Sequence, residues 1–70
     1  MNNQQIIRCL KDGGYLRETG SGFGWCHLHD KDGNKVQRHI NPKLILRLKQ
    51  NRDIKYSGGL NYYWRNRYEQ

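Results

Sequence analysis

Apolar residues recur at two spacings along this chain, and the change of spacing divides it into helices and strands. The first apolar residues lie three or four positions apart and predict a helix from about Asn3 to Asp12. Asn2 or Asn3 can cap its start, because a short polar side chain accepts a hydrogen bond from the first turn. Gly13 and Gly14 end it, because a glycine readily takes the left-handed conformation found there.

Alternating apolar and polar residues predict strands in the next stretch. An extended segment at 15–19 leads into a glycine-rich turn at 20–24. Strands at 25–29 and 35–40 flank a turn at 30–34, whose Asp-Gly-Asn composition tolerates positive φ. Alternation places successive side chains on opposite faces. The residues expected inward are Cys26, Leu28, Val36 and Ile40, and those expected outward are His27, His29, Gln37 and His39.

A second helix and a second hairpin complete the pattern. The helix runs from Asn41-Pro42 to about Asn51, since asparagine caps a helix and proline suits its first position. A hairpin over 54–64 follows, with Ser-Gly-Gly at its tip. Tyr63 is expected to face outward. The residues expected to share the core face of this hairpin are Ile54, Tyr56, Leu60, Tyr62 and Trp64.

The order α-β-β-β-α-β-β predicts a small α+β domain over residues 1–70, with a flexible tail at 65–70. From 41 to 64 the chain resembles the end of a winged-helix domain. The matching features are a helix carrying Arg47-Leu48-Lys49 and a glycine-tipped hairpin ending in Tyr62-Tyr63-Trp64. That resemblance implies a recognition helix followed by a wing. Upstream the pattern departs, because a β-hairpin fills the place of the helix-turn-helix.

The whole chain also resembles the YjhX family of small bacterial proteins. Four stretches carry the resemblance: Leu10 to Gly14, Asp32-Gly33, Leu46 to Lys49, and Asn61 to Tyr63. The family is described as inhibiting a DNA topoisomerase. The resemblance therefore implies a protein inhibitor. Chains of this size and charge are also frequent among phage and prophage products that block host machinery.

Charge narrows the classes of partner. The chain has 70 residues with 13 Lys and Arg against 6 Asp and Glu, a net charge of +7. Such a surplus attracts polyanions and acidic protein surfaces. No run approaches the ~20 apolar residues that a membrane span needs, and the start does not resemble a signal peptide. Two cysteines without paired spacing favour reduced thiols and a cytoplasmic location. No cofactor is expected.

Cations and aromatic residues mark the candidate binding sites. A stripe on the second helix can contact phosphates and base edges. Arginines interleaved with tyrosines near the end suit base stacking or a protein contact. A solvated helix face and a frayed tail are the alternatives. The expected binding residues are Lys43, Arg47, Lys49, Gln50, Arg52, Lys55, Tyr63, Arg65 and Arg67, with Tyr68, Phe23 and Trp25 as further aromatic candidates.

Three histidines on one predicted sheet face raise two further chemistries. A structural zinc site needs a fourth ligand, and Cys26 points to the opposite face of a regular strand, so no metal site is expected. His27 or His29, with His39 and Arg38, suits the general acid–base cleavage of RNA by a small metal-free ribonuclease. This alternative is less favoured than binding.

The sequence therefore favours a non-enzymatic module that binds nucleic acid, DNA more than RNA. The alternative is a protein inhibitor that docks on an acidic surface of a host enzyme acting on nucleic acid. A topoisomerase, a nuclease or a CRISPR-type complex would fit that description. Charge alone does not separate these two hypotheses, because both targets attract cations.

Overall fold

The computed structural model describes residues 1–19 and 25–65. The elements run α1 (Asn3–Lys11), β1 (Tyr15–Glu18), β2 (Cys26–His29), β3 (Lys35–Ile40), α2 (Pro42–Gln50), β4 (Ile54–Gly58) and β5 (Asn61–Trp64). The strands form one antiparallel sheet in the order β3-β2-β1-β5-β4, with β1 at its centre. The expected α+β class is confirmed.

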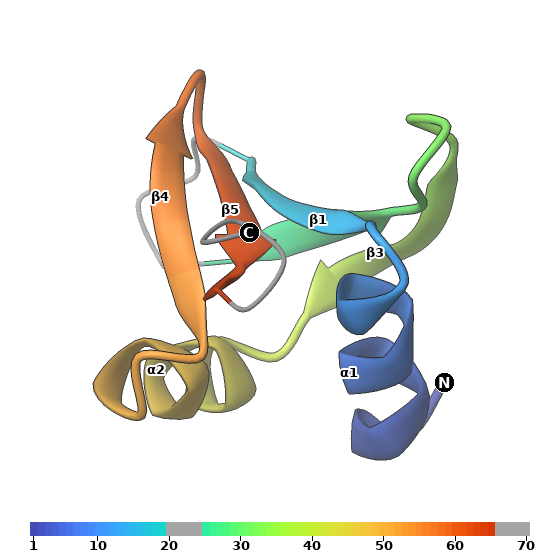
Figure 1. The fold of residues 1–70 in the computed structure, drawn as a ribbon. Coiled ribbons are helices and arrows are strands. Elements are labelled where there is room, and N and C mark those ends of the chain that lie inside the picture. The colour runs from blue at the N-terminus through green and yellow to red at the C-terminus, as the bar shows by residue number, and fades with distance from the viewer. Residues whose placement is uncertain (20–24, 66–70) are drawn as a thin grey trace.

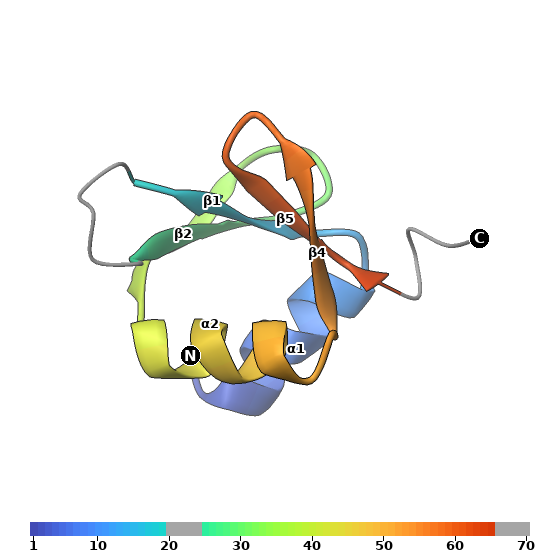
Figure 2. The ribbon, with the colours of Figure 1, turned by 90° about the vertical axis from the view of Figure 1, so that its left-hand side faces the viewer.

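Both helices lie on the same side of a curved sheet, and the other side of the sheet carries neither helix (Figures 1 and 2). Each helix has nine residues, and within the described ranges there is no helix long and apolar enough to cross a membrane. The core fills the space between the two layers. Its residues are Ile6, Leu10, Leu16, Cys26, Leu28, Ile40, Leu44, Ile45, Leu48, Ile54 and Trp64.

This layout differs from a winged-helix domain. The residues between α1 and α2 form three strands of the sheet, so these two helices do not make a helix-turn-helix. α2 packs its apolar residues against the inner face of the sheet (Figure 2). The β4–β5 hairpin is part of the main sheet, because β5 pairs with β1.

Helix α1 begins with a capping box. The Asn2 Oδ1 atom accepts a hydrogen bond from the Gln5 backbone N–H at 2.9 Å, and Gln5 Oε1 accepts one from the Asn2 N–H at 2.9 Å. Two N–H groups that the helix leaves unsatisfied are therefore paired. Asn2 is the cap, and Asn3 is the first helical residue. Asn41 plays the same part for α2, accepting from the Lys43 N–H at 2.9 Å.

Helix α2 ends with Arg52 in the left-handed region, at φ 60°. The Asp53 N–H donates to the Leu48 carbonyl at 2.9 Å and the Arg52 N–H to the Lys49 carbonyl at 3.0 Å. This is a Schellman motif, which usually carries glycine at the position of Arg52. In α1 the corresponding residue is Gly13, at φ 113°. Arg52 is therefore held at a position where its Cβ is crowded.

Replacing Arg52 with glycine is expected to preserve or raise stability, by up to roughly 1 kcal/mol, because the backbone strain is relieved. For a domain of this size the unfolding midpoint would rise by at most about 4–8 °C. Thermal denaturation followed by circular dichroism measures this change. Arg52→Ala keeps the strain and is the control. A glycine variant less stable than the alanine variant would contradict the prediction.

Strand β3 departs from the expected alternation. Val36 was expected in the core, but it is 43% exposed. Gln37 was expected outward, yet it pairs with buried Leu28, and its Oε1 atom is buried without a hydrogen-bond partner among residues 1–19 and 25–65. The cause is irregular pairing. The register shifts on both sides of Leu28, and a bulge of this kind moves the following residues to the other face.

The β4–β5 hairpin buries fewer residues than expected. Ile54 and Trp64 are in the core and Tyr62 packs against it. Tyr56 and Leu60 were also expected there, but they are 50% and 42% exposed. The hairpin tip extends away from both helices (Figure 1), so nothing in the helical layer covers it. A register shift after Tyr56 and a positive φ of 67° at Leu60 further break the alternation.

Candidate nucleic-acid interface

The open face of the sheet carries one aromatic or basic side chain from each strand in a single row. Directly opposed residues on neighbouring strands share a face of the sheet. The opposed pairs are Lys35–His29, His29–Tyr15, Tyr15–Tyr63 and Tyr63–Lys55. The row Lys35, His29, Tyr15, Tyr63, Lys55 therefore crosses all five strands. These five residues form the sheet-face row.

The three rings of the sheet-face row pack against one another. Tyr15 and His29 are stacked, with centroids 5.0 Å apart and ring planes 3° from parallel. Tyr15 and Tyr63 have centroids 5.3 Å apart and planes tilted by 34°. All three residues are partly exposed, and the lysines at the two ends are exposed. The rings thus hold one another in place while keeping surface available to a ligand.

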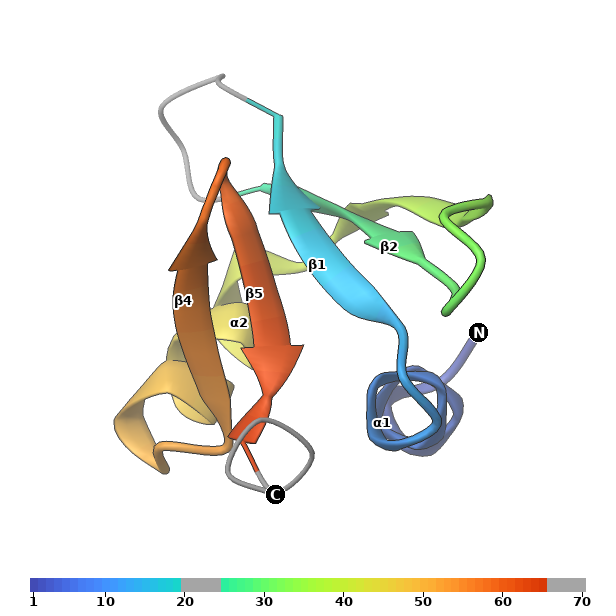
Figure 3. The same cartoon turned by 45° about the horizontal axis from the view of Figure 1, so that its top comes forward.

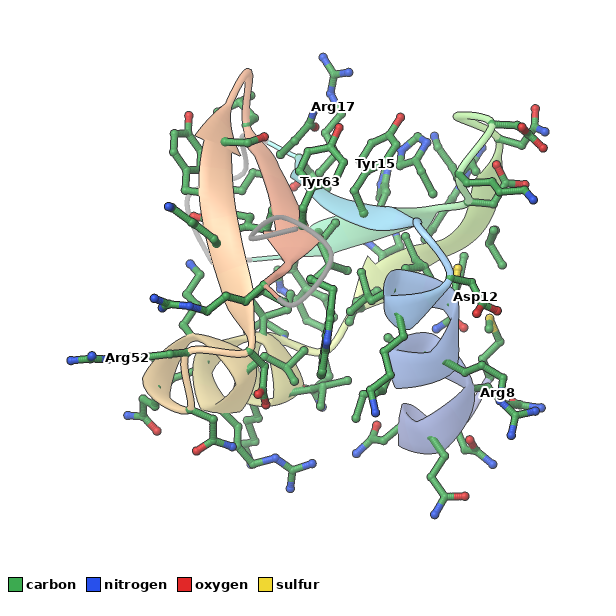
Figure 4. The ribbon with its side chains drawn as sticks, in the orientation of Figure 1. Arg8, Asp12, Tyr15, Arg17, Arg52 and Tyr63 are labelled. Carbon is green, nitrogen blue, oxygen red and sulfur yellow. The ribbon has the colours of Figure 1, made fainter. Side chains whose placement is uncertain are left out.

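Arg17 adds a cation beside this row. It follows Tyr15 by two positions on β1, and it pairs with His27 on β2 and Asn61 on β5. Tyr15, Arg17 and Tyr63 all point away from the two helices (Figure 4). Figure 3 shows β1 and β5 side by side in the middle of this face. The site is therefore built on central strands of the sheet.

Lys49, one of the expected binding residues, is engaged with other side chains of the chain. Its Nζ atom lies 4.0 Å from Glu18 Oε1 and 4.5 Å from the centre of the Tyr62 ring. The Tyr62 hydroxyl donates to the same Glu18 oxygen at 2.6 Å. Burial, followed by this hydrogen bond, raises the pKa of Tyr62. Lys49 thus helps to balance a partly buried carboxylate.

The remaining α2 residues of the expected set lie apart from the sheet-face row. Lys43 and Arg47 are exposed and line a hollow with Asn3 and Asn41 between the two helices. Gln50 is also exposed on α2. Because α2 covers the inner face of the sheet, these side chains do not share a surface with the row (Figure 2).

The other expected residues are divided between three places. Lys55 and Tyr63 belong to the sheet-face row. Arg52 points away from the body of the protein at the end of α2 (Figure 4). Arg65 directly follows β5, where its backbone N–H donates to the Asp53 carbonyl at 2.8 Å. Arg67, Phe23 and Tyr68 lie outside the described residues.

The three histidines do not form one cluster. His29 stacks on Tyr15, whereas the His27 and His39 rings meet edge to face with centroids 5.6 Å apart. Over residues 1–19 and 25–65, no group of three or more His, Cys, Asp or Glu side chains is placed to hold a metal ion. The imidazoles instead make ring contacts and hydrogen bonds.

A hollow of about 610 Å³ beside α1 is the other candidate site. It is lined by Met1, Gln5, Arg8, Cys9, Asp12, Asp30 and Lys31. Arg8 and Asp12 project on this side of α1 (Figure 4). Burial, then the charges of Asp30 and Asp12, raise the pKa of the Cys9 thiol, so it stays protonated near neutral pH. The lining mixes both charge signs around an unreactive thiol, and it favours no ligand class.

Sequence reasoning missed three members of the site, Tyr15, Arg17 and Lys35, and it considered His29 for metal binding or for RNA cleavage only. The signal for the first two was present, because Tyr15 and Arg17 alternate with Leu16 and so face outward together. What was missing was the pairing of β1 with β5, which brings Tyr15 beside Tyr63.

Comparisons with known protein families, curated proteins and solved structures give no match.

Proposed function

We propose that this chain binds single-stranded nucleic acid on the open face of its sheet. The observation that carries the proposal is the sheet-face row, in which three partly exposed rings lie between two lysines. Bases stack on aromatic side chains, and phosphates pair with the cations beside them. Neighbouring strands lie about 4.8 Å apart, so the three rings extend over roughly 10 Å, enough for two or three bases.

The rings of the sheet-face row favour the binding of single strands over that of duplexes. The faces of bases are stacked against one another inside a duplex, which offers a protein only its phosphates and base edges. Rings that lie along a sheet can contact base faces only where the bases are unpaired. The expected ligand is therefore an unpaired strand rather than the duplex that a recognition helix would read.

Electrostatic attraction adds to stacking. Lys35, Lys55 and Arg17 surround the rings, and the whole chain carries +7. Binding that neutralises phosphates releases counterions, so affinity falls as the salt concentration rises. A single-strand affinity that decreases steeply with salt is therefore expected, together with weaker binding of duplex of the same length.

Fluorescence anisotropy with labelled single-stranded and duplex octamers across a salt series tests this proposal. The variant Lys35→Glu/Lys55→Glu removes the cations of the row. Lys43→Glu/Arg47→Glu is the matched control on α2, since each variant exchanges two exposed cations for two anions. The row variant is expected to lose roughly 10-fold or more in affinity beyond the loss of the control. The reverse ranking would place the interface on α2 instead.

A protein inhibitor is the second candidate function. The observation in its favour is the β4–β5 tip, where Tyr56 and Leu60 are half exposed. Exposed apolar side chains beside cations suit an acidic protein surface. A nucleic-acid-processing enzyme, such as a topoisomerase, is the expected target. Weak binding of every octamer, combined with stoichiometric capture of one partner that Tyr56→Ser/Leu60→Ser abolishes, would favour this candidate.

A further inference from the structure

The open face holds a second group of rings at one end of β2. Trp25 and His39 meet edge to face with centroids 6.0 Å apart, and His39 meets His27 in the same way at 5.6 Å. Arg17 is opposed to His27 across the β1–β2 pair. His27 and His29 are two residues apart on one strand, so this group lies about 7 Å from the sheet-face row.

The backbone of β3 is bent to bring His39 into this group. His39 has φ 56°, a left-handed conformation that side chains other than glycine rarely adopt. It lies in the irregular stretch of the β2–β3 pairing, between the pairs that Leu28 and Cys26 make. Bulges re-aim side chains, and strained residues concentrate at binding sites. Glycine would fit this backbone without strain, whereas the chain carries an imidazole that contacts two other rings.

The imidazole of His27 has hydrogen-bonding capacity that the nearby cations lack. Burial lowers its pKa, and the charges of Lys35, His39, His29 and Arg38 lower it further. Arg17 faces it from β1 as another cation. His27 is therefore neutral at pH 7, with one nitrogen that donates and one that accepts. Base edges present both donors and acceptors, whereas lysine and arginine only donate.

We propose that Trp25, His27 and His39 form a base-reading subsite that extends the sheet-face row. Its ligand is a single strand that carries a preferred base at one position. This inference rests on the proposed function. The rings of the sheet-face row stack on any base, whereas the subsite provides the preference for one base through hydrogen bonds to its edge. Arg17 lies beside His27 and two positions from Tyr15, where the phosphate that links a base on the row to a base on the subsite would pass.

The contact between the two histidines favours reading over cleavage. General acid–base cleavage of RNA places its acid and base on opposite sides of one phosphate. His27 and His39 instead touch edge to face, which leaves no space for a phosphate between the rings. A ligand is therefore expected to lie against the pair and to remain intact.

Affinities for single-stranded octamers of adenosine, cytidine and thymidine or uridine, in deoxy and ribo forms, test the subsite. The unmodified protein is expected to bind the preferred octamer roughly 10-fold more tightly than the octamer it binds least well, because one base-specific hydrogen-bonded contact provides about that much discrimination. His39→Gly suits the backbone and removes the ring, so it should reduce this ratio of affinities to about 3-fold or less. His27→Ala should do the same. His27→Gln keeps a donor and an acceptor and should retain part of the preference.

The outcomes separate this inference from the function on which it rests. Tyr15→Ala should weaken all octamers by a similar factor, and it serves as the control for the row. Equal binding of every octamer by the unmodified protein would overturn the subsite and leave single-strand binding intact. Binding of no octamer would overturn both. Cleavage of the ribo-octamers that His27→Ala abolishes would also overturn the inference, because the pair would then be catalytic.

Acidification gives a second readout. As the pH falls below the lowered pKa of His27, the ring gains a proton and loses its acceptor. The base preference should then shrink while the overall affinity rises, because the added positive charge attracts phosphate without regard to sequence. The His27→Ala variant should lack this loss of preference. A preference that grows in acid would overturn the role given to His27.

Discussion

Replacing Tyr15 and Tyr63 together with alanine is expected to weaken the binding of a single-stranded octamer by roughly 30-fold or more. Stacking of one base on one ring contributes about 1–3 kcal/mol by alanine substitution, and this variant removes two neighbouring rings. The two side chains face outward from central strands, and neither belongs to the buried core. The fold should therefore persist. Anisotropy titrations at one fixed salt concentration measure the loss.

Two controls assign that loss to stacking. Tyr15→Phe/Tyr63→Phe keeps both rings and should bind within about 3-fold of the unmodified protein. The slope of affinity against salt should be unchanged in the alanine variant, because the cations around the rings remain. If the alanine variant binds almost as well as the unmodified protein, with an unaltered circular dichroism spectrum, the open face is not the binding surface.

Gly14→Ala is expected to lower the stability of the domain by roughly 3 kcal/mol, through overpacking at the junction of α1 with the sheet. A Cβ atom at this position would lie 2.5 Å from the His29 carbonyl oxygen and 2.9 Å from both the carbonyl oxygen and the Sγ atom of Cys9. Two of these three atoms belong to the backbone, so they cannot rotate away. The unfolding midpoint should fall by about 12–24 °C.

Thermal and urea denaturation followed by circular dichroism measure this change. Ser57→Ala, at an exposed position on β4, is the control and should change stability by less than about 0.5 kcal/mol. A Gly14→Ala protein as stable as this control would show that α1 can move away from β2 at little cost. Because a Cβ atom at position 14 would press on the backbone of His29, a shifted junction should also disturb the ring that stacks on Tyr15.

Local features of the fold could be predicted from the sequence because they depend on residues close together in the chain. The Asn2 cap, the Asn41-Pro42 start of α2 and the turn after His29 each arise from short polar or glycine residues at fixed offsets. Apolar spacing likewise identified most of the core. Val36 and Gln37 were misplaced because a bulge reverses the alternation, and a single strand's pattern does not reveal a bulge.

The candidate site was only partly predictable, because its geometry depends on which strands pair. Lys55 and Tyr63 belonged to the expected set, which centred on the helix stripe of Lys43 and Arg47. That stripe is visible in the sequence because its members lie one helical turn apart. The sheet-face row joins residues from five strands, and its central contact needs β1 to pair with the last strand of the chain. No local pattern carries that information.

The position of β1 between β2 and β5 has a consequence for how the site forms during synthesis. The β1–β2 and β4–β5 pairings join neighbouring strands, but the β1–β5 pairing closes a loop that contains β2, β3, α2 and β4. Such long loops close late during folding, because closing the loop costs chain entropy before the stabilising contacts between β1 and β5 have formed. A chain emerging from the ribosome therefore has Tyr15 long before Tyr63. Completion of the central ring pair is expected to be a late folding step, so that a nascent chain would gain its full affinity only after β5 is released.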